Sequence, residues 1–236
     1  MFRAIISLIL WPLWAMMFLF GAFIYSVSIL FLPSYRLHPL ARVLAVLFMV
    51  FGGQWFRIKG TAPDQKKGPY LYMMNHESLF DGFMMVAGIR HYFTGVGAIE
   101  QFSYPVWGYL VKKYGVIPII RQKLDNAISS LIQAEEAIKE GVSMMIAPEG
   151  TRTLTGELSP FKKGPFHVAK NTGITIVPVG LVGAYHAKSK NDWRIRPGVL
   201  TTVFGDPIEK KDYKNLSLDE LRSLVKDKIE ELIKVK

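Results

Sequence analysis

The N-terminal segment places the tightest constraint on the fold, because no charged side chain lies between Ala4 and Leu32. As a helix, this run of 29 residues would be about 43 Å long at ~1.5 Å per residue, compared with ~30 Å for the hydrocarbon core of a bilayer. Trp11, Trp14 and Tyr25 are residue types that favour the membrane interface. The run predicts a membrane anchor, either one spanning helix followed by an interfacial helix or a helix pair that dips into a single leaflet.

The alternative for this segment is a secretory signal peptide. The apolar run is far longer than the ~7–15 apolar residues of a signal peptide, however, and no A-x-A cleavage pattern follows it. A second apolar stretch, residues 43–51, is too short to span a bilayer and follows a basic stretch, residues 33–42, which we expect to be a linker. Residues 1–56 are therefore expected to hold the anchoring helices, and residues 57–236 one folded domain.

Beyond the anchor the chain is basic. Residues 33–236 contain 28 of the 29 lysines and arginines and all 19 acidic residues, which leaves a formal charge of +9. Such a domain is attracted to an anionic membrane surface, a phosphorylated small molecule or an acidic carrier protein. Nucleic acid is a competing partner that we do not expect, because the basic residues are scattered and no nucleic-acid-binding motif occurs. The chain has no cysteine, which excludes disulfides, thiolate metal sites and a cysteine nucleophile.

After residue 57, short apolar runs alternate with amphipathic ones, which predicts an α/β domain. Strands are expected at residues 70–74, 92–99, 116–120, 143–147, 174–183 and 199–204. Helices are expected at residues 79–89, 106–114, 125–141 with Asp125 as the cap, and 166–170. A last helix should begin at the capping box formed by Ser217 and Glu220.

The stretch YMMNHESLFDGFMM, residues 72–85, places polar residues in an otherwise apolar run. If the chain turns after His76 into a helix, Asp81 can fold back towards the imidazole. A carboxylate on one ring nitrogen fixes the tautomer and leaves the other nitrogen free to accept a proton. An imidazole, with a reference pKa of ~6.5, suits base catalysis near neutral pH. The pair therefore has the composition of an oriented general base.

Three other interpretations of this stretch stay open on the residues alone. A zinc site would need a second histidine at helical spacing, and Phe80 occupies that position. Ser78 could be a nucleophile, although it lacks a G-x-S-x-G elbow. His76 and Asp81 could also do no more than stabilise a turn, because H-x₄-D occurs often by chance.

A second polar constellation follows the strand expected at residues 143–147. Pro148 and Gly150 end the strand and expose backbone N–H groups. Arg152 supplies a guanidinium fork suited to the paired oxygens of a phosphate, and Glu149 can hold this arginine or bond a neighbouring hydroxyl. These residue types together are suited to binding a phosphorylated ligand.

Further basic residues add to this constellation. Lys162 and Lys163 contribute charge, and Gly164 allows a turn that is open to an anion. Arg121 directly follows the apolar run GVIPII. Taken singly, each of these features is equally typical of a solvent-exposed loop or of a charge at the end of a strand.

Together, these blocks resemble the 1-acylglycerol-3-phosphate acyltransferase family of glycerolipid acyltransferases. Four family blocks occur in order: NHESLFD (75–81), GVIPIIR (115–121), PEGTR (148–152) followed by GELSPFKKGPFHVAKNTG, and IVPVG (176–180). The resemblance covers about residues 55–205. It implies one α/β acyltransferase domain, a mixed sheet flanked by helices, behind an N-terminal hydrophobic helical anchor.

The resemblance also implies the chemistry. A fatty acyl chain would pass from acyl-CoA or acyl carrier protein to the sn-2 hydroxyl of 1-acylglycerol 3-phosphate, giving phosphatidic acid without a cofactor or metal. His76 would deprotonate the hydroxyl, which attacks the thioester directly, and Asp81 would orient His76. The family pattern assigns binding of the acceptor to Arg121, Glu149, Gly150, Thr151, Arg152 and Lys163. The expected location is the cell membrane, with the catalytic domain facing the cytoplasm.

The sequence departs from the common family pattern. Residues 97–105 (GAIEQFSYP) contain no lysine where members often carry A-K-K-E-L, and Lys112 and Lys113 are candidates to replace it. Ile120 stands where an acidic residue often precedes the arginine, and Ala147 where phenylalanine is usual.

The missing lysine keeps another acceptor open, such as glycerol 3-phosphate, a different lysophospholipid or a lyso-ornithine lipid. A non-catalytic lipid-binding membrane protein is the alternative outside the enzymes.

Overall fold

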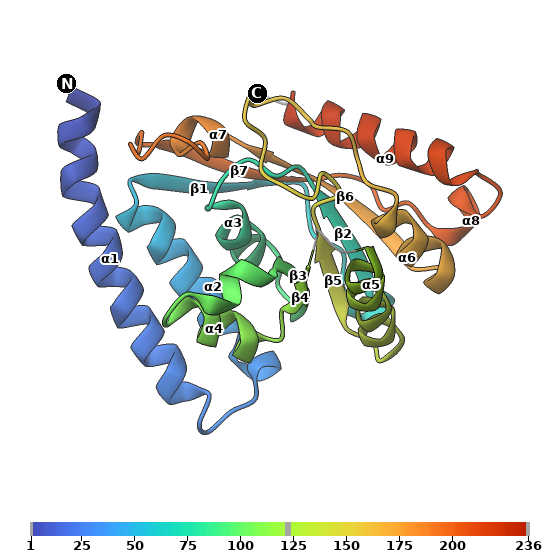
Figure 1. Ribbon diagram of the computed structural model, residues 1–236, viewed down its shortest axis with the longest axis horizontal. Helices are drawn as coiled ribbons and strands as arrows, with labels where there is room; N and C mark the ends of the chain where they lie inside the picture. Colours follow the sequence, from blue (N-terminus) through green and yellow to red (C-terminus); the bar gives the residue numbers. More distant parts are fainter. Residues whose placement is uncertain (1, 121–123, 235–236) are drawn as a thin grey trace.

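The computed structural model describes residues 2–120 and 124–234, which form a sheet with helices on both faces (Figure 1). The strands are β1 (Gln54–Lys59), β2 (Tyr70–Met74), β3 (Phe93–Ala98), β4 (Ile117–Ile119), β5 (Ser143–Ile146), β6 (Thr175–Val182) and β7 (Gly198–Phe204). The α-helices are α1 (Phe2–Ser28), α2 (Ser34–Phe51), α3 (Asp81–Gly88), α4 (Trp107–Tyr114), α5 (Leu124–Lys139), α6 (Gly164–Thr172), α7 (Ala184–Ala187), α8 (Lys210–Tyr213) and α9 (Leu218–Ile233). Short 3₁₀ helices occur at η1 (Gln65–Lys67) and η2 (Ile99–Ser103).

The strands are ordered β1-β7-β6-β2-β5-β3-β4. Neighbouring strands run parallel except for β6 and β7, which are antiparallel, so the sheet is mixed, as predicted. The central strand β2 is buried along its whole length. Because alternate side chains of a strand point to opposite faces, Tyr70, Tyr72 and Met74 enter one core cluster, and Leu71 and Met73 enter the other.

Helices cover both faces of the sheet. Ala45 of α2 and Met84 of α3 belong to the first core cluster, on one face. The second cluster, on the other face, takes Ala134 of α5, Phe166 of α6 and Leu221 of α9. In Figure 1 these two helical layers lie on either side of the strands. The apolar spacing of each helix therefore matches the face of the sheet that it covers.

The two N-terminal helices lie against each other. Their shared cluster contains Met17 and Tyr25 of α1 and Leu37, Leu44 and Phe48 of α2. The side of α1 that faces away from α2 is exposed and apolar, and it carries Ile5, Leu8, Ile9, Leu13, Met16, Leu19, Phe20, Phe23 and Val27. By length and composition, both helices could cross a membrane.

The basic stretch at residues 33–42 is not a linker, and that prediction was wrong. Helix α2 begins at Ser34 and runs through this stretch. His38 is buried, with Nδ1 2.8 Å from the hydroxyl of Tyr114 and Nε2 3.0 Å from the carbonyl of Ile89. Polar residues that suggested an exposed linker therefore include one whose hydrogen bonds are satisfied inside the protein.

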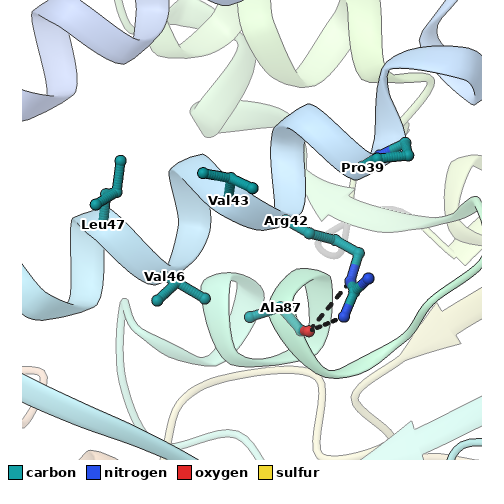
Figure 2. A pocket seen from close by; sticks show the side chains of 6 residues that line it. All are labelled: Pro39, Arg42, Val43, Val46, Leu47 and Ala87. Carbon is teal, nitrogen blue, oxygen red and sulfur yellow. Dashed lines mark hydrogen bonds between the residues drawn. The ribbon is translucent and has the colours of Figure 1, made fainter.

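Arg42 of α2 has a similar inward role. Its guanidinium donates from Nε and Nη2 to the carbonyl of Ala87, at 3.3 and 3.2 Å, near the end of α3 (Figure 2). A cation at this position satisfies a carbonyl in the last turn of a helix, where intrahelical partners are missing. A pocket of about 290 Å³ adjoins the contact and is lined by Pro39, Val43, Val46 and Leu47 beside these two residues. Its described lining contains none of the predicted site residues.

The bounds of the predicted elements agree with the structure to within a few residues, with informative exceptions. Ser217 and Glu220 form the predicted capping box of α9. Helix α5 begins at Leu124, so Asp125 lies inside the helix and is not its cap. The predicted boundary between residues 56 and 57 falls inside β1, which pairs with β7. The division into an anchor and a catalytic domain stays a prediction.

Candidate active site

Three neighbouring parallel strands, β5, β2 and β6, end at the same edge of the sheet. The polar segments at residues 148–153, 75–81 and 183–188 follow these strands. In α/β proteins, ligands commonly bind outside the carboxyl ends of parallel strands. The strand order thus brings together the two segments that the sequence singled out and a third that it did not.

His76 and Asp81 are joined at this edge. The imidazole Nδ1 lies 2.7 Å from Oδ2 of Asp81. The side chain of His76 is 22% exposed, while that of Asp81 is 0% exposed. Because an ionised carboxylate can only accept hydrogen bonds, Nδ1 carries the proton. The Nε2 atom has no hydrogen-bond partner among the side chains and backbone groups that the structure describes.

Asp81 also organises the turn that precedes it. Its Oδ2 accepts hydrogen bonds from the backbone N–H groups of Glu77 at 2.7 Å and Ser78 at 2.9 Å. Its Oδ1 is buried and has no partner in the described part of the chain. The carboxylate therefore fixes both the turn and the ring of His76.

Glu149 supports the same turn from the neighbouring strand. Its Oε1 accepts from the backbone N–H of His76 at 2.6 Å, and its Oε2 accepts from the N–H of Ser159 at 2.9 Å. In return, the backbone N–H of Thr153 donates to the carbonyl of His76 at 2.8 Å. Glu149 is buried and forms no ion pair with Arg152, one of the two roles that the sequence suggested for it.

Gly150, Thr151 and Arg152 form the loop beside this support. Gly150 has a φ of +74°, a left-handed conformation that favours glycine, and its N–H donates to the carbonyl of Ala147 at 3.0 Å. Thr151 is exposed, with Oγ1 3.4 Å from Nζ of Lys190. Arg152 is half-buried and makes no hydrogen bond or ion pair to another described residue. Its guanidinium is thus available to a ligand.

Of the two remaining predicted residues, the structure describes only Lys163. The ammonium of Lys163 lies 3.2 Å from a carboxylate oxygen of Asp219 in the first turn of α9, and about half of each side chain is exposed. Arg121 lies outside the described residues. The binding roles of both residues stay predictions.

Asn75 and Glu77, whose roles were not predicted, join the end of β2 to β6 and to α7, respectively. Asn75 Oδ1 accepts from the backbone N–H of Leu181 at 2.7 Å, and its Nδ2 donates to the carbonyl of Leu181 at 2.9 Å. Glu77 accepts from Asn75 Nδ2 at 3.0 Å and from the backbone N–H of Tyr185 at 2.9 Å. The sequence signal was the unbroken polar run at residues 75–78.

Ser78 makes a further link to the third segment. Its hydroxyl donates to the backbone carbonyl of Lys188 at 2.7 Å, and the residue is only 1% exposed. These contacts assign Ser78 to the framework of the site, because its proton is already donated within the protein. Lys188 was also missed by sequence reasoning.

Burial changes the acidity of both neighbouring glutamates. It raises the pKa of Glu77 to about 7, although the N–H of Tyr185 favours the ionised form. It also raises the pKa of Glu149, and the N–H groups of Ser159 and His76 oppose this effect. In both glutamates, burial therefore disfavours the ionised form of the carboxyl group.

A metal site was one of the alternatives for this segment. Within the described ranges, no group of three or more histidine, aspartate or glutamate side chains is arranged to hold a metal ion. Asp81 and Glu149 each use carboxylate oxygens to accept hydrogen bonds from the turn around His76.

The sequence of this chain is similar to those of known acyltransferases. The sequence model of the family described as Acyltransferase matches residues 56–182, more than half of the chain. A 1-acyl-sn-glycerol-3-phosphate acyltransferase from Cocos nucifera is 34% identical over 156 residues, 66% of this chain and 51% of that protein. One of the same name from Haemophilus influenzae is 28% identical over 196 residues, 82% of this chain and 80% of that protein.

The fold has a solved counterpart. The crystal structure of the 1-acyl-sn-glycerophosphate (LPA) acyltransferase PlsC from Thermotoga maritima superposes with a TM-score of 0.83 at 22% identity, covering 97% of this chain and 95% of that one. This chain spans only about half the length of the coconut relative. The family match, the similar sequences and the shared fold confirm the resemblance drawn from the four sequence blocks, and the chain belongs to the acyltransferase family.

Proposed function

We propose that this protein transfers a fatty acyl group from a thioester donor to the free sn-2 hydroxyl of 1-acylglycerol 3-phosphate, giving phosphatidic acid. The observation that carries the proposal is the bond of 2.7 Å between His76 Nδ1 and Asp81 Oδ2, while Nε2 has no partner in the described part of the chain. A binding protein needs no proton acceptor of this kind. The names of the similar proteins support this choice of substrate.

In the proposed reaction, Nε2 of His76 accepts the proton of the lysolipid hydroxyl. The hydroxyl oxygen attacks the carbonyl carbon of the thioester, and a new ester C–O bond replaces the C–S bond. The thiolate that leaves takes this proton from the imidazolium of His76 and departs as a free thiol, which restores the neutral imidazole. Asp81 stabilises the imidazolium formed in between, because its buried carboxylate already accepts from Nδ1. General-base catalysis of this type typically contributes ~10²–10⁴ in rate.

The acceptor's phosphate is assigned to the loop of Gly150, Thr151 and Arg152. Arg152 is the cation of this loop, and it has no partner among the described residues. The bond from Thr153 N–H to the carbonyl of His76 holds the loop against the catalytic turn. Arg121 and Lys163 remain proposed contributors, with Glu149 acting through the turn. A phosphate held beside His76 would position the nearby hydroxyl of the same small molecule.

Membrane attachment through α1 and α2 fits this reaction, because lysolipid and product both reside in the bilayer. The exposed apolar side of α1 supports the proposal. We place the protein at the cell membrane with the domain of residues 57–236 on the cytoplasmic side, where acyl-CoA and acyl carrier protein are both possible donors.

The second candidate function is acyl transfer to an acceptor other than 1-acylglycerol 3-phosphate. Residues 97–105 contain no lysine, and the ammonium of Lys163 is paired with Asp219, so fewer free cations serve a phosphate than the family pattern implies. An acceptor with a different head group would need fewer of them.

The test is release of free thiol from acyl-CoA and from acyl carrier protein with a panel of acceptors. The panel contains 1-acylglycerol 3-phosphate, glycerol 3-phosphate, other lysophospholipids and lyso-ornithine lipid. We expect the highest kcat/KM with 1-acylglycerol 3-phosphate and phosphatidic acid as the product. No turnover with this acceptor, together with turnover of another, would reject the proposed substrate.

A further inference from the structure

Lys188 is a buried cation that none of the sequence blocks includes. It follows α7, directly after the third of the three parallel strands, and is 7% exposed. Its backbone N–H donates to the carbonyl of Ala184 at 3.1 Å, and its carbonyl accepts from the hydroxyl of Ser78 at 2.7 Å. The residue is thus fixed to the turn that carries His76 and Asp81.

The ammonium of Lys188 has unused hydrogen-bonding capacity. It donates to the carbonyl of Ser189 at 2.8 Å, the one bond of this side chain to a described residue, although an ammonium has three donors. The carboxylate that acts on it, Asp192, is bound to Arg3 at 3.1 Å and to Arg194 at 2.9 Å. Lys188 therefore has no carboxylate of its own in the described structure.

A second cation, Arg152, is close enough to act on Lys188 electrostatically. Segment 185–190 packs on the loop of Arg152, because Tyr185 Oη donates to the carbonyl of Leu154 at 2.9 Å and Lys190 Nζ lies 3.4 Å from Thr151 Oγ1. Burial lowers the pKa of Lys188, and the positive charge of Arg152 lowers it further. When two cations are close together, shielded from water and not paired with a carboxylate, an anion placed between them stabilises both.

We infer that Lys188 joins Arg152 in holding the phosphate of the acceptor, and that it is a positioning and specificity residue. The inference rests on the proposed function. In 1-acylglycerol 3-phosphate the phosphate is attached to the same glycerol as the reacting hydroxyl, so its site must lie close to His76. The phosphates of CoA lie a full pantetheine arm away from the thioester. The bond from the Ser78 hydroxyl to the backbone carbonyl of Lys188 places this residue next to the turn that carries His76, within the region that the acceptor's phosphate would occupy.

An open cavity lies next to this position. A cavity of about 550 Å³ is lined by Leu154, Tyr185, Ser189 and Trp193, among others, and includes Ala4 of α1. Ser189, the neighbour of Lys188, therefore borders the same cavity as the N-terminal end of the proposed anchor.

Lys112 and Lys113, the candidates to replace the lysine missing from residues 97–105, lie in another part of the structure. The carbonyl of Lys113 accepts from the hydroxyl of Ser34, beyond the C-terminal end of α1. The loop after Lys188 contacts the opposite, N-terminal end of α1, where Ile195 N–H donates to Ser7 Oγ at 2.9 Å. The helix between Ser7 and its last residue is about 30 Å long at ~1.5 Å per residue. Lys112, next to Lys113, is thus a matched control.

The test uses the full chain with Lys188→Met, Lys188→Arg and Lys112→Met. For Lys188→Met we expect the KM for 1-acylglycerol 3-phosphate, and the inhibition constant of inorganic phosphate, to rise about tenfold or more, because a hydrogen bond to a charged group is lost. The KM for the acyl donor should stay within about threefold of wild type. Lys188→Arg should retain acceptor binding, and Lys112→Met should match wild type. Thermal unfolding should show Lys188→Met to be at least as stable as wild type, since a buried cation next to Arg152 is removed.

Each other outcome has a definite meaning. Wild-type protein that does not acylate 1-acylglycerol 3-phosphate would refute the proposed function, and this inference with it. An active wild type with unchanged acceptor KM and phosphate inhibition in Lys188→Met would refute the role of Lys188 alone. A rise in donor KM in place of acceptor KM, or a Lys188→Arg variant as impaired as Lys188→Met, would also overturn the assignment.

Discussion

At the scale of single residues, the site depends on how one carboxylate distributes its oxygen atoms. Oδ2 of Asp81 accepts from His76 Nδ1 and from two backbone N–H groups, while Oδ1 is buried without a described partner. The negative charge is thus held against the imidazole and is shielded from water. In the proposed reaction, this arrangement would favour the proton that Nε2 takes up from the acceptor.

Asp81→Asn tests this arrangement. The asparagine oxygen can still accept from the N–H groups of Glu77 and Ser78, but the negative charge is lost and a buried amide N–H₂ takes the place of Oδ1. We expect kcat to fall about a hundredfold or more, and stability to fall by about 1–3 kcal/mol for the unsatisfied amide. Steady-state kinetics and chemical denaturation measure the two effects. Asp227→Asn, on the exposed side of α9, is the control, and equal activity of the two variants would contradict the role of Asp81.

The pairing of His76 with Asp81 could be predicted, since both residues and their spacing are local. The role of Glu149 could not, because its partners are a backbone N–H across the neighbouring strand and the N–H of Ser159. The sequence around Lys188 did not indicate a functional role either. It lies in a lysine-rich stretch typical of exposed loops, and only the fold shows that it is buried beside Arg152.

At the scale of elements, Glu77 joins the end of β2 to α7. It is 8% exposed and accepts from Asn75 Nδ2 and from the N–H of Tyr185. Because burial raises its pKa from 4.5 to about 7, the folded protein retains a proton between these pH values that the unfolded chain has released. The free energy of unfolding therefore decreases as pH rises through this window, by up to about 3 kcal/mol.

Glu77→Gln removes this titration. We expect the variant to show a smaller loss of stability than wild type between pH 5 and pH 8, measured by urea denaturation at intervals of one pH unit. Glu157→Gln, at an exposed position in the next loop, should keep the wild-type slope. An identical slope in Glu77→Gln and wild type would show that Glu77 does not titrate in this range.

Elements with a strong local pattern were predicted well. The buried run at residues 70–74 is β2, and the capping box of α9 has the predicted residues. The linker at residues 33–42 was wrong, because burial of a polar helix face depends on contacts with distant segments such as Tyr114. Strand β1 was not expected, since its side chains beyond the first are largely exposed and its pairing with β7 is made far along the chain.

At the scale of the whole molecule, α1 contacts the loop that follows Lys188 and also carries the proposed membrane surface. Arg3 pairs with Asp192 at 3.1 Å, and Trp11 Nε1 donates to the carbonyl of Trp193 at 2.8 Å. The same helix has an apolar exposed side and belongs to a chain of net charge +10. Both properties favour an anionic bilayer.

Phe20→Ser with Phe23→Ser tests the membrane contact. These side chains are 57% and 68% exposed, and each phenylalanine moved into lipid contributes about 1.5–3 kcal/mol. We expect binding to vesicles of anionic phospholipid to weaken at least about tenfold in co-sedimentation. Ile128→Ser with Ile132→Ser, exposed on α5, should bind as wild type. Equal loss in both double variants would mean that α1 is not the membrane contact.

The fold class was predictable because the alternation of apolar runs is a property of the whole sequence, and the four blocks lie in the order of the family. What the sequence does not contain is the strand order, which brings segments after β5, β2 and β6 to one edge. The sequence therefore predicted two of the three segments that meet there and left out residues 183–188.

The most direct measurement is the rate of thiol release from acyl donor by His76→Ala with 1-acylglycerol 3-phosphate. We expect kcat to fall at least about a hundredfold, with acceptor KM and thermal stability close to wild type, because the half-buried ring makes its side-chain bond to Asp81 alone among the described residues. His167→Ala, at an exposed position on α6, should keep full activity. A folded His76→Ala protein that turns over within about threefold of wild type would contradict a general base at this position.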